Sequence, residues 1–444
     1  MLPLPPRPNL KQYKKRAKDL VTAAKSKDQG AIRAWATEWL ETLVKLLGIT
    51  FTPFIQGSLD GVVGEIEARV RETMTTPHAK GGRFTLADAQ FFIARAHGFE
   101  NWSEFANHLE RLFREDPEGR EFEAAVDAVV TGDLSTLESL VRRHPDLIRA
   151  RSARTHRATL LHYVAANGVE GYRQRTPPNA VAVARFLLEA GAEVDALGNT
   201  YGGDKYQTTM NLLVSSTHPA EAGLQPALVE VLLDFGAAIN GLEEDESPLM
   251  TALAFGYSEA AETLARRGAR VDNVIAAAAL GRSDMVRSFV IDKATLRSDV
   301  PLIAPYWMGI PNDPKAHIEL AFVWACKFGR AQVVDFFLEM GVDPTAKDSV
   351  GMTALHWAAA NGLMDVIDKL LERGAPLEVE NTWGGTVLDS TVYSALNHHV
   401  DGADYLAVIE TLISAGADVG AVTPFPTGNQ HIDDLLRRHG ARPG

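Results

Sequence analysis

Two stretches of the chain decide the fold: residues 353–362 read TALHWAAANG, and residues 159–168 read TLLHYVAANG. The first is followed by KLLERGAPLE at residues 369–378, in which an apolar helical stretch ends at a Gly-Ala pair. Glycine just after such a stretch supplies the left-handed cap that ends many helices. The pattern predicts a helix closed by glycine, then a polar segment, then the next helix.

The same glycine recurs after apolar helical stretches along most of the chain. Its occurrences, two of them close variants of the pattern, are Gly191, Gly236, Gly268, Gly341, Gly374, Gly416 and Gly440. Successive spacings are 45, 32, 73, 33, 42 and 24 residues. A unit of about 33 residues explains two spacings directly, the longest as two units with an insert, and the last as a truncated unit. We therefore predict a repeat array.

The motifs and their spacing resemble the ankyrin repeat, whose consensus carries T-P-L-H-x-A-A-x-x-G and then a second helix ending in L-L-x-x-G-A. The resemblance covers about residues 120–444. It implies an all-α fold, in which an ankyrin-repeat solenoid of about eight repeats follows a smaller helical N-terminal domain. We place the N-terminal domain at residues 1–115 and the solenoid at residues 116–444. The expected units begin near Phe122, Ala158, Thr208, Ser247, Val274, Ile318, Met352 and Thr386.

The last expected element is a closing helix over His431–His439. Terminal repeats must present a polar outer face. We therefore predict that Leu435 and Leu436 face inward and that charged residues such as Asp433 face outward.

Residues 1–115 follow a different pattern. A basic, then apolar, helix is predicted over Tyr13–Leu47, with Trp35 and Trp39 on its apolar stripe, and GITFTPFIQGSLDG at residues 48–61 breaks the pattern. Farther along, LADAQFFIARAHGFENW predicts one helix that ends at Gly98 and a second that follows it. This arrangement resembles the N-terminal helical region of a group of bacterial ankyrin-repeat proteins, which implies a bacterial source and no particular chemistry.

Composition excludes several classes of protein. The chain has 444 residues, of which 46% are hydrophobic, so wholesale disorder is excluded. Its single cysteine, Cys326, can form neither an internal disulfide nor a Cys-based zinc site. The absence of a long apolar run or a secretory signal predicts a cytoplasmic protein with no membrane span. A net charge of −13 disfavours duplex nucleic acid as a partner. No motif predicts a cofactor or a metal site.

In an ankyrin array, loops between units project as fingers beside the first helices and form the concave surface that usually binds ligands. NTYGG at residues 199–203 and NTWGG at residues 381–385 place Tyr201 and Trp383 at equivalent fingertips. The paired glycines would let each ring lie over the groove, or they merely form a turn while the ring packs on a neighbouring finger. A third, proline-rich finger presents Tyr306 and Trp307.

Charges on the fingers also divide by sign. The first finger, residues 149–157, offers Arg154 and His156 among its basic residues, and the third offers Asp245 in an acidic run. If both line one concavity, the groove runs from cationic to anionic and suits a charged ligand or a polar peptide. Solvated loop ends of opposite sign explain the same pattern equally well.

Histidines and polar replacements within the repeat motif suggest different roles. His162 and His356 occupy the consensus histidine, which the resemblance assigns to hydrogen bonds between neighbouring loops. Asn211 and Asp389 replace that histidine in other units. A buried polar replacement must find a partner, so Asp389, close in sequence to Trp383, is the first candidate for a catalytic base.

Two hypotheses follow. The first is a binding protein that holds a protein or peptide in the concave groove through aromatic and charged fingers. The second is a small-molecule enzyme or sensor, in which the N-terminal domain caps a pocket and Asp389 or His156 acts as base, with Tyr206 as proton donor and Lys205 or Arg154 as anion clamp. The predicted ligand-binding residues are Arg154, Tyr201, Lys205, Asp245, Tyr306, Trp307, Trp383 and Tyr393. A closed pocket with converging polar groups would favour the enzyme.

Overall fold

The structure is a computed structural model of the chain. It describes residues 2, 4, 8–26, 28, 30–46, 53–75, 84–113, 117–201, 206–242, 247–398, 400 and 402–442. The chain divides into two compact units, a first unit of residues 1–245 and a second unit of residues 246–444. The boundary predicted at residue 115 lies inside the first unit and stays a prediction.

The first unit begins with five helices. These are α1 (Leu10–Lys25), α2 (Ala31–Leu46), α3 (Pro53–Thr75), α4 (Leu86–Ala96) and α5 (Trp102–Phe113). Trp35 and Trp39 are buried in their common core, as the apolar stripe predicts. Within that core the His97 ring stacks on the Phe105 ring, with centroids 5.3 Å apart and an interplanar angle of 7°. The basic N-terminal segment therefore belongs to a packed helical structure.

The single helix predicted over Tyr13–Leu47 is wrong, because α1 ends at Lys25 and α2 begins at Ala31. Between them, the backbone N–H of Gly30 donates to the Asp28 carboxylate at 2.8 Å. Such local hydrogen bonds compete with helix, and glycine is a poor helix former. The predicted break at residues 48–61 is too long, since α3 already begins at Pro53, a residue type that fits the first turn of a helix.

The rest of the first unit consists of short helices. They are α6 (Pro117–Thr131), α7 (Leu134–Arg143), η1 (Pro145–Ile148), α8 (Leu160–Val164), η2 (Gly171–Arg173), α9 (Ala180–Glu189), α10 (Thr209–Leu213), α11 (Thr217–Glu221) and α12 (Gln225–Asp234). Successive helices pack against one another, α6 on α7 and α8, and α9 on α12. The insert after residue 168 contains η2 and carries part of a buried charge cluster described below.

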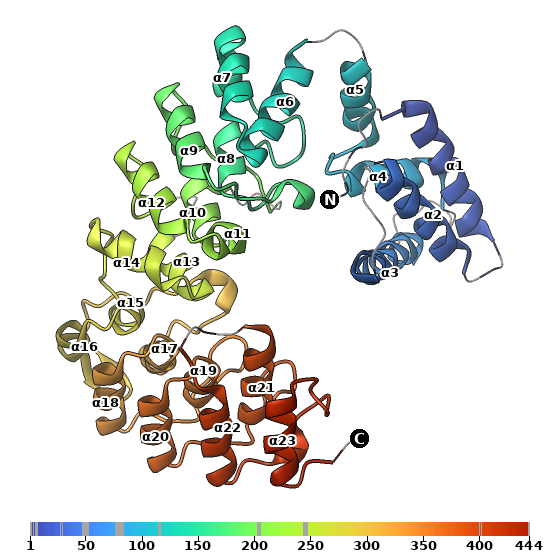
Figure 1. Ribbon diagram of the computed structural model, residues 1–444. Helices are drawn as coiled ribbons and strands as arrows, with labels where there is room; N and C mark the ends of the chain where they lie inside the picture. Colours follow the sequence, from blue (N-terminus) through green and yellow to red (C-terminus); the bar gives the residue numbers. More distant parts are fainter. Residues whose placement is uncertain are drawn as a thin grey trace. The chain divides into compact units, whose positions relative to one another are not determined.

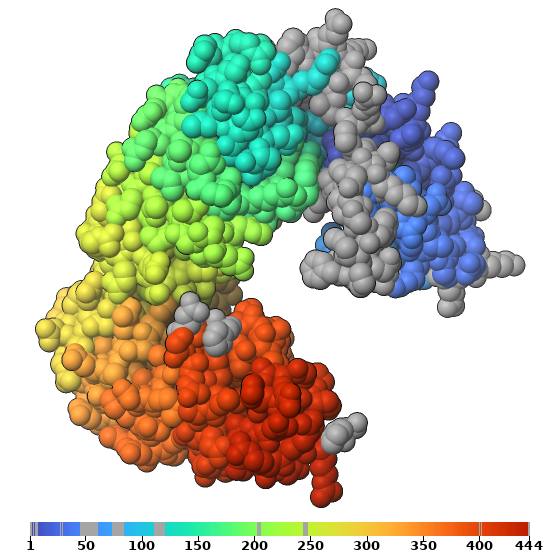
Figure 2. Space-filling model, in the orientation of Figure 1, coloured from blue at the N-terminus to red at the C-terminus, as the bar shows by residue number. Residues whose placement is uncertain are grey.

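The second unit repeats a pair of helices. Its elements are α13 (Pro248–Phe255), α14 (Ser258–Arg266), α15 (Val274–Ala279), α16 (Ser283–Phe289), β1 (Val290–Asp292), β2 (Thr295–Leu296), η3 (Tyr306–Met308), α17 (Pro314–Lys327), α18 (Ala331–Glu339), α19 (Ala354–Ala360), α20 (Met364–Glu372), α21 (Val387–Asn397), α22 (Tyr405–Ser414), η4 (Val419–Ala421) and α23 (Gln430–Arg438). Helices α17, α19 and α21 form one row and α18, α20 and α22 a second row (Figure 1). The surface of this unit is coloured yellow to red in Figure 2.

Almost all regular structure in the described residues is helical. The two short strands form an antiparallel hairpin in which Val290 lies opposite Leu296. The predicted glycine caps are present: Gly191 and Gly374 adopt φ of 96° and 74° after α9 and α20. No helix within the described ranges is both long and apolar enough to cross a bilayer.

The consensus histidines connect neighbouring loops, as predicted. The backbone N–H of Thr353 donates to His356 Nδ1 at 3.2 Å, and His356 Nε2 lies 3.4 Å from the carbonyl oxygen of Gly385 in the next finger. His162 makes the same pair of contacts, with Thr159 and Gln207. Burial lowers the pKa of each imidazole to about 4, so both rings are neutral at pH 7.

The closing helix α23 matches the prediction except at Asp433. Leu435 and Leu436 are buried as expected, but Asp433 is buried as well. Its carboxylate accepts hydrogen bonds from the backbone N–H and the hydroxyl of Thr427, both at 2.7 Å. The outward orientation predicted for Asp433 is therefore wrong, because this carboxylate satisfies the loop before the helix.

Candidate functional site

The second unit contains a groove of about 850 Å³ on the side formed by the first helix of each helix pair. We use "the groove" for the hollow whose aromatic and charged lining residues are Phe255, Trp307, Trp324, Lys327, Phe328, Arg330, Asp348, Trp357 and Trp383. The ends of α13, α17 and α19 supply part of this lining, and the fingers before α17, α19 and α21 supply the rest. That these fingers form a binding surface stays a prediction.

Trp383 is the most exposed large apolar residue in the described chain, at 75% exposure. Its finger is held by Asn381, whose side-chain oxygen accepts from the backbone N–H of Trp383 at 2.9 Å and of Gly385 at 3.1 Å. The neighbouring Gly384 adopts φ of 81°, a conformation that other residues rarely adopt. The NTWGG finger is therefore an ordered turn that presents an uncovered indole.

Trp307 lines the groove from the proline-rich finger and is 45% exposed. Its ring centroid lies 6.3 Å from that of Phe255 at an angle of 48°, within the range of favourable aromatic pairs. Tyr306 packs edge-on against Trp307 with centroids 5.6 Å apart. This finger therefore places the Trp307 ring in the groove lining and the Tyr306 ring beside the groove.

Lys327, the last residue of α17, lies inside the groove and is partly exposed. Its ammonium donates to the carbonyl oxygen of Ala254 at 2.9 Å and lies 4.6 Å from the Trp357 ring centroid. Burial lowers the pKa of Lys327 to about 8, and the negative charge of Asp348 opposes that shift. Cations near the C-terminal carbonyls of a helix are favourable, which accounts for its position at the end of α13.

Asp348 fixes the Trp357 side of the groove. One carboxylate oxygen accepts from the Trp357 indole N–H at 2.7 Å, and the other accepts from the backbone N–H groups of Val350 and Met352, each at 3.0 Å. Burial raises the pKa of Asp348, and these hydrogen bonds oppose the shift. The carboxylate therefore has its acceptor sites largely occupied by the protein.

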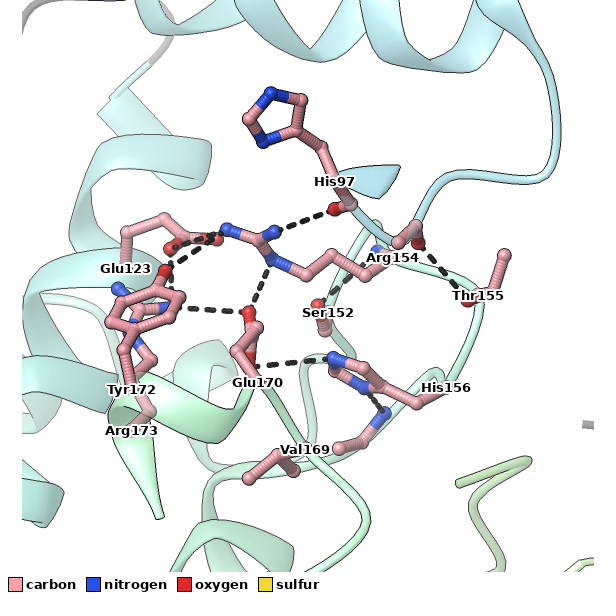
Figure 3. A network of polar contacts seen from close by, with 12 residues as sticks. His97, Glu123, Ser152, Arg154, Thr155, His156, Val169, Glu170, Tyr172 and Arg173 are labelled. Carbon is pink, nitrogen blue, oxygen red and sulfur yellow. Dashed lines mark hydrogen bonds and ion pairs between the residues drawn. The ribbon is translucent and has the colours of Figure 1, made fainter. Parts of the chain in front are cut away.

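The first unit contains a buried charge cluster (Figure 3). Its members are Glu123, Arg154, His156, Glu170 and Arg173, and the exposed Asp127 pairs with Arg173 at its edge. Arg154 and Glu170 are 1% and 0% exposed, and the guanidinium Nε of the first pairs with a carboxylate oxygen of the second. His156 Nε2 lies 3.5 Å from the other oxygen of Glu170.

The charge cluster joins the first finger to the turn between α4 and α5. Arg154 Nη1 donates to the carbonyl oxygen of His97 at 3.0 Å, and the backbone N–H of Thr155 donates to that of Gly98 at 3.0 Å. Burial alone would raise the pKa of Glu170, but the adjacent charge of Arg154 and the bond from His156 hold it well below its ordinary value. Glu170 is therefore ionised and paired, as in a structural ion network.

The predicted site residues fall into several places. Arg154 and His156 meet at Glu170, and Trp307 and Trp383 line the same groove. Tyr393 is exposed on α21 outside the groove lining, with its ring 5.6 Å from that of His398.

Asp389 lies in the second unit, where its carboxylate accepts from the backbone N–H of Thr423 at 2.9 Å and burial raises its pKa. His156 and Tyr206 belong to the first unit. Tyr201, also in the first unit, is 59% exposed, while burial of its hydroxyl raises its pKa. Lys205 and Asp245 lie outside the described residues.

Sequence reasoning missed Lys327 and Trp357 in the groove and Glu170 in the charge cluster. A usable signal existed for Trp357, which occupies the variable position of T-x-L-H-x-A-A in residues 353–359. Lys327 and Glu170 carry no such motif signal: Lys327 contacts Ala254, 73 residues away, and Glu170 lies in an insert outside the repeat motif.

One comparison with known proteins identifies the repeat. A family model described as ankyrin repeats in three copies matches residues 273–382 and 322–423. A crystal structure of the human ASB11 ankyrin repeat domain is similar with 21% identity and a TM-score of 0.33, over 66% of this chain and 98% of that one. No curated protein sequence matches the chain significantly. The chain therefore contains ankyrin repeats, which the family model places within residues 273–423.

Proposed function

We propose that the protein is an ankyrin-repeat binding protein that holds a protein or peptide ligand in the groove of its second unit. Ankyrin repeats typically mediate interactions between proteins. The observation that carries the proposal is the groove of about 850 Å³, into which two fingers present the exposed rings of Trp307 and Trp383.

The exposed rings make this surface suited to binding. Trp is strongly enriched among the few residues that dominate interface energetics, provided that its ring becomes buried in the complex. Covering an indole removes about 200 Å² of surface from water, and at about 25 cal/mol per Å² this contributes a few kcal/mol before the costs of association. The ordered finger around Trp383 lowers those costs, because the ring is already held in place.

The wider architecture belongs to the same proposal. We infer an array of about eight units over residues 116–444 behind a helical domain of residues 1–115. Successive helix pairs from α6 and α7 to α21 and α22 support this array. A cytoplasmic location, a bacterial source and the exclusion of duplex nucleic acid remain parts of the proposal that rest on the sequence.

Selection of peptides tests the proposed function. A phage-displayed library of random short peptides is panned on the full chain, and enriched peptides are titrated against wild type, Trp307→Ala and Trp383→Ala. We expect each variant to lose at least about tenfold in affinity, since truncation of an interface Trp costs more than about 1.4 kcal/mol. Tyr393→Ala is the matched control, an exposed aromatic in the same unit but outside the groove lining.

Two results would contradict the proposed function. In the first, no peptide is enriched on the folded wild-type chain. In the second, enriched peptides bind both tryptophan variants as tightly as wild type, which would place the binding surface elsewhere.

A further inference from the structure

We infer that the ligand of the groove is a peptide segment with an acidic side chain, Asp or Glu, whose carboxylate binds the ammonium of Lys327. This inference rests on the proposed function and specifies the chemistry of its partner. It depends on the contacts that Lys327 makes, on the pairing of the other charges in the groove and on the aromatic walls.

No carboxylate of the described residues forms an ion pair with Lys327, although the negative charge of Asp348 acts on its ammonium from a longer distance. Its ammonium donates to the carbonyl oxygen of Ala254 at 2.9 Å and, more weakly, lies 3.5 Å from that of Leu253. No described carboxylate lies within 4.0 Å of this nitrogen, the limit for an ion pair. An ammonium has three N–H donors, so at least one remains for a ligand.

The other charged side chains that line the groove already have hydrogen-bond partners within the protein. Arg330 donates to the carbonyl oxygen of Ala279 at 2.7 Å and to Glu262 Oε1 at 3.0 Å. Asp348 accepts three hydrogen bonds, from the Trp357 indole and two backbone N–H groups. Lys327 is therefore the charged group of the groove that best fits an incoming ion.

The aromatic rings around Lys327 strengthen an ion pair between its ammonium and a ligand carboxylate. The ammonium lies 4.6 Å from the Trp357 ring centroid, 5.5 Å from that of Phe328 and 5.7 Å from that of Trp324. Rings exclude water, and a charge-assisted hydrogen bond in such surroundings is about twice as strong as a neutral one. The net charge of −13 repels an acidic ligand, but it acts on the groove from farther away. At physiological salt, exposed charges are largely screened beyond about 8 Å.

The same walls define what flanks the acidic side chain. Trp307 and Trp383 are exposed on fingers that line the groove together with Lys327. Rings at such positions contact apolar or aromatic side chains, whereas a polyanion would present mainly charge. The expected ligand motif is thus one acidic residue between apolar residues.

The test uses the full chain and two phage-displayed libraries of short peptides that differ at a single fixed central position. One library has Asp at that position and the other has Asn, with random residues on both sides. We expect the Asp library to be enriched on wild type at pH 7 by about tenfold or more over the Asn library, the gain of one charge-assisted hydrogen bond. Lys327→Met should abolish this preference, and Lys327→Arg should retain part of it.

Lys369→Met is the matched control, since it removes a lysine of the same unit that is paired with Asp335 and does not line the groove. The Asp preference should persist in this variant. If Lys327→Met and a second neutral variant, Lys327→Gln, both fail to fold, wild type is panned at pH 7 and at about pH 9.5. Lys327, with a pKa of about 8, is then neutral while nearby Asp348 stays ionised, and the preference should disappear.

The outcomes separate this inference from the proposed function. If both libraries are enriched equally and lose binding in Trp383→Ala, the groove binds peptides but Lys327 does not select a carboxylate. An Asp preference that survives the removal of the Lys327 charge also overturns the inference. If neither library is enriched, the proposed function fails and this inference fails with it.

Discussion

Arg154 in the first unit and Lys327 in the second unit are both cations beside an aromatic ring, and they differ in what neutralises them. The Arg154 guanidinium lies 5.5 Å from the Phe99 ring centroid and pairs with Glu170, which is fully buried. The Lys327 ammonium lies 4.6 Å from the Trp357 ring centroid, is partly exposed, and contacts backbone carbonyls. One charge is thus compensated inside the fold and the other is open to a ligand.

This difference separates a structural cluster from a candidate site. Both places contain perturbed titratable groups, and such groups mark functional sites as well as structural ion networks. What distinguishes them is access, because Lys327 lines the groove and Glu170 has no exposed surface. Arg154 and His156, predicted as ligand-binding and catalytic residues, lie in the closed cluster.

The largest expected effect comes from breaking the closed cluster. Glu170→Ala removes the fully buried carboxylate that pairs with Arg154 and leaves this guanidinium only a 3.9 Å contact with Glu123, and loss of one member of a buried pair costs about 3–5 kcal/mol. We expect the free energy of unfolding of the first unit to fall by about this amount in urea denaturation. Asp299→Asn removes an exposed pair with Arg297 and should cause no measurable change. A wild-type denaturation curve for Glu170→Ala would show that the cluster does not stabilise the unit.

An intermediate effect is the pH dependence of the free energy of unfolding that Lys327 causes. The pKa of Lys327 is about 8 in the folded chain against 10.5 ordinarily, so between these values the unfolded chain holds a proton that the folded chain has lost. Stability therefore rises with pH across this window, and the rise should be absent in Lys327→Met. Glu170 gives the same sign in a different window, since its folded pKa lies below 4.5 and its contribution to stability is lost as pH falls below that value.

Urea denaturation of wild type and Lys327→Met from pH 7 to 11 measures the difference directly, because groups other than Lys327 contribute equally to both proteins. A wild-type curve that runs parallel to the variant over the whole range would show that Lys327 keeps an ordinary pKa, as a fully hydrated lysine does.

The features that the sequence predicts correctly depend on short-range patterns. Gly374 caps α20 and His356 connects two loops, and each follows from a motif of a few residues. Trp383 is exposed because its finger is formed by hydrogen bonds within residues 381–385. The helix predicted over residues 13–47 is wrong for a similarly local reason, the hydrogen bond that the backbone N–H of Gly30 donates to the Asp28 carboxylate.

The residues that the sequence does not reveal have distant partners. Lys327 contacts a carbonyl group 73 residues away, and Arg173 meets Asp127 across 46 residues. Charged residues such as Glu170 are almost always exposed, so an insert that contains one is expected to be solvated. The packing of helices and loops that lie apart in the sequence brings such groups together.

The smallest expected effect separates binding from stability in the groove. Trp383 is 75% exposed, so Trp383→Ala should change the free energy of unfolding by less than about 0.5 kcal/mol, the usual range for surface substitutions. Trp324 lines the same groove but is 1% exposed, and Trp324→Ala should cost about 3–5 kcal/mol by leaving a cavity. Thermal and urea unfolding of the two variants measures both values.

A large loss for Trp383→Ala would mean that its ring stabilises the finger, and reduced peptide binding by that variant would then reflect a collapsed groove. If Trp383→Ala keeps its stability but loses peptide affinity, the exposed ring acts on the ligand directly, in contrast to the closed cluster around Arg154.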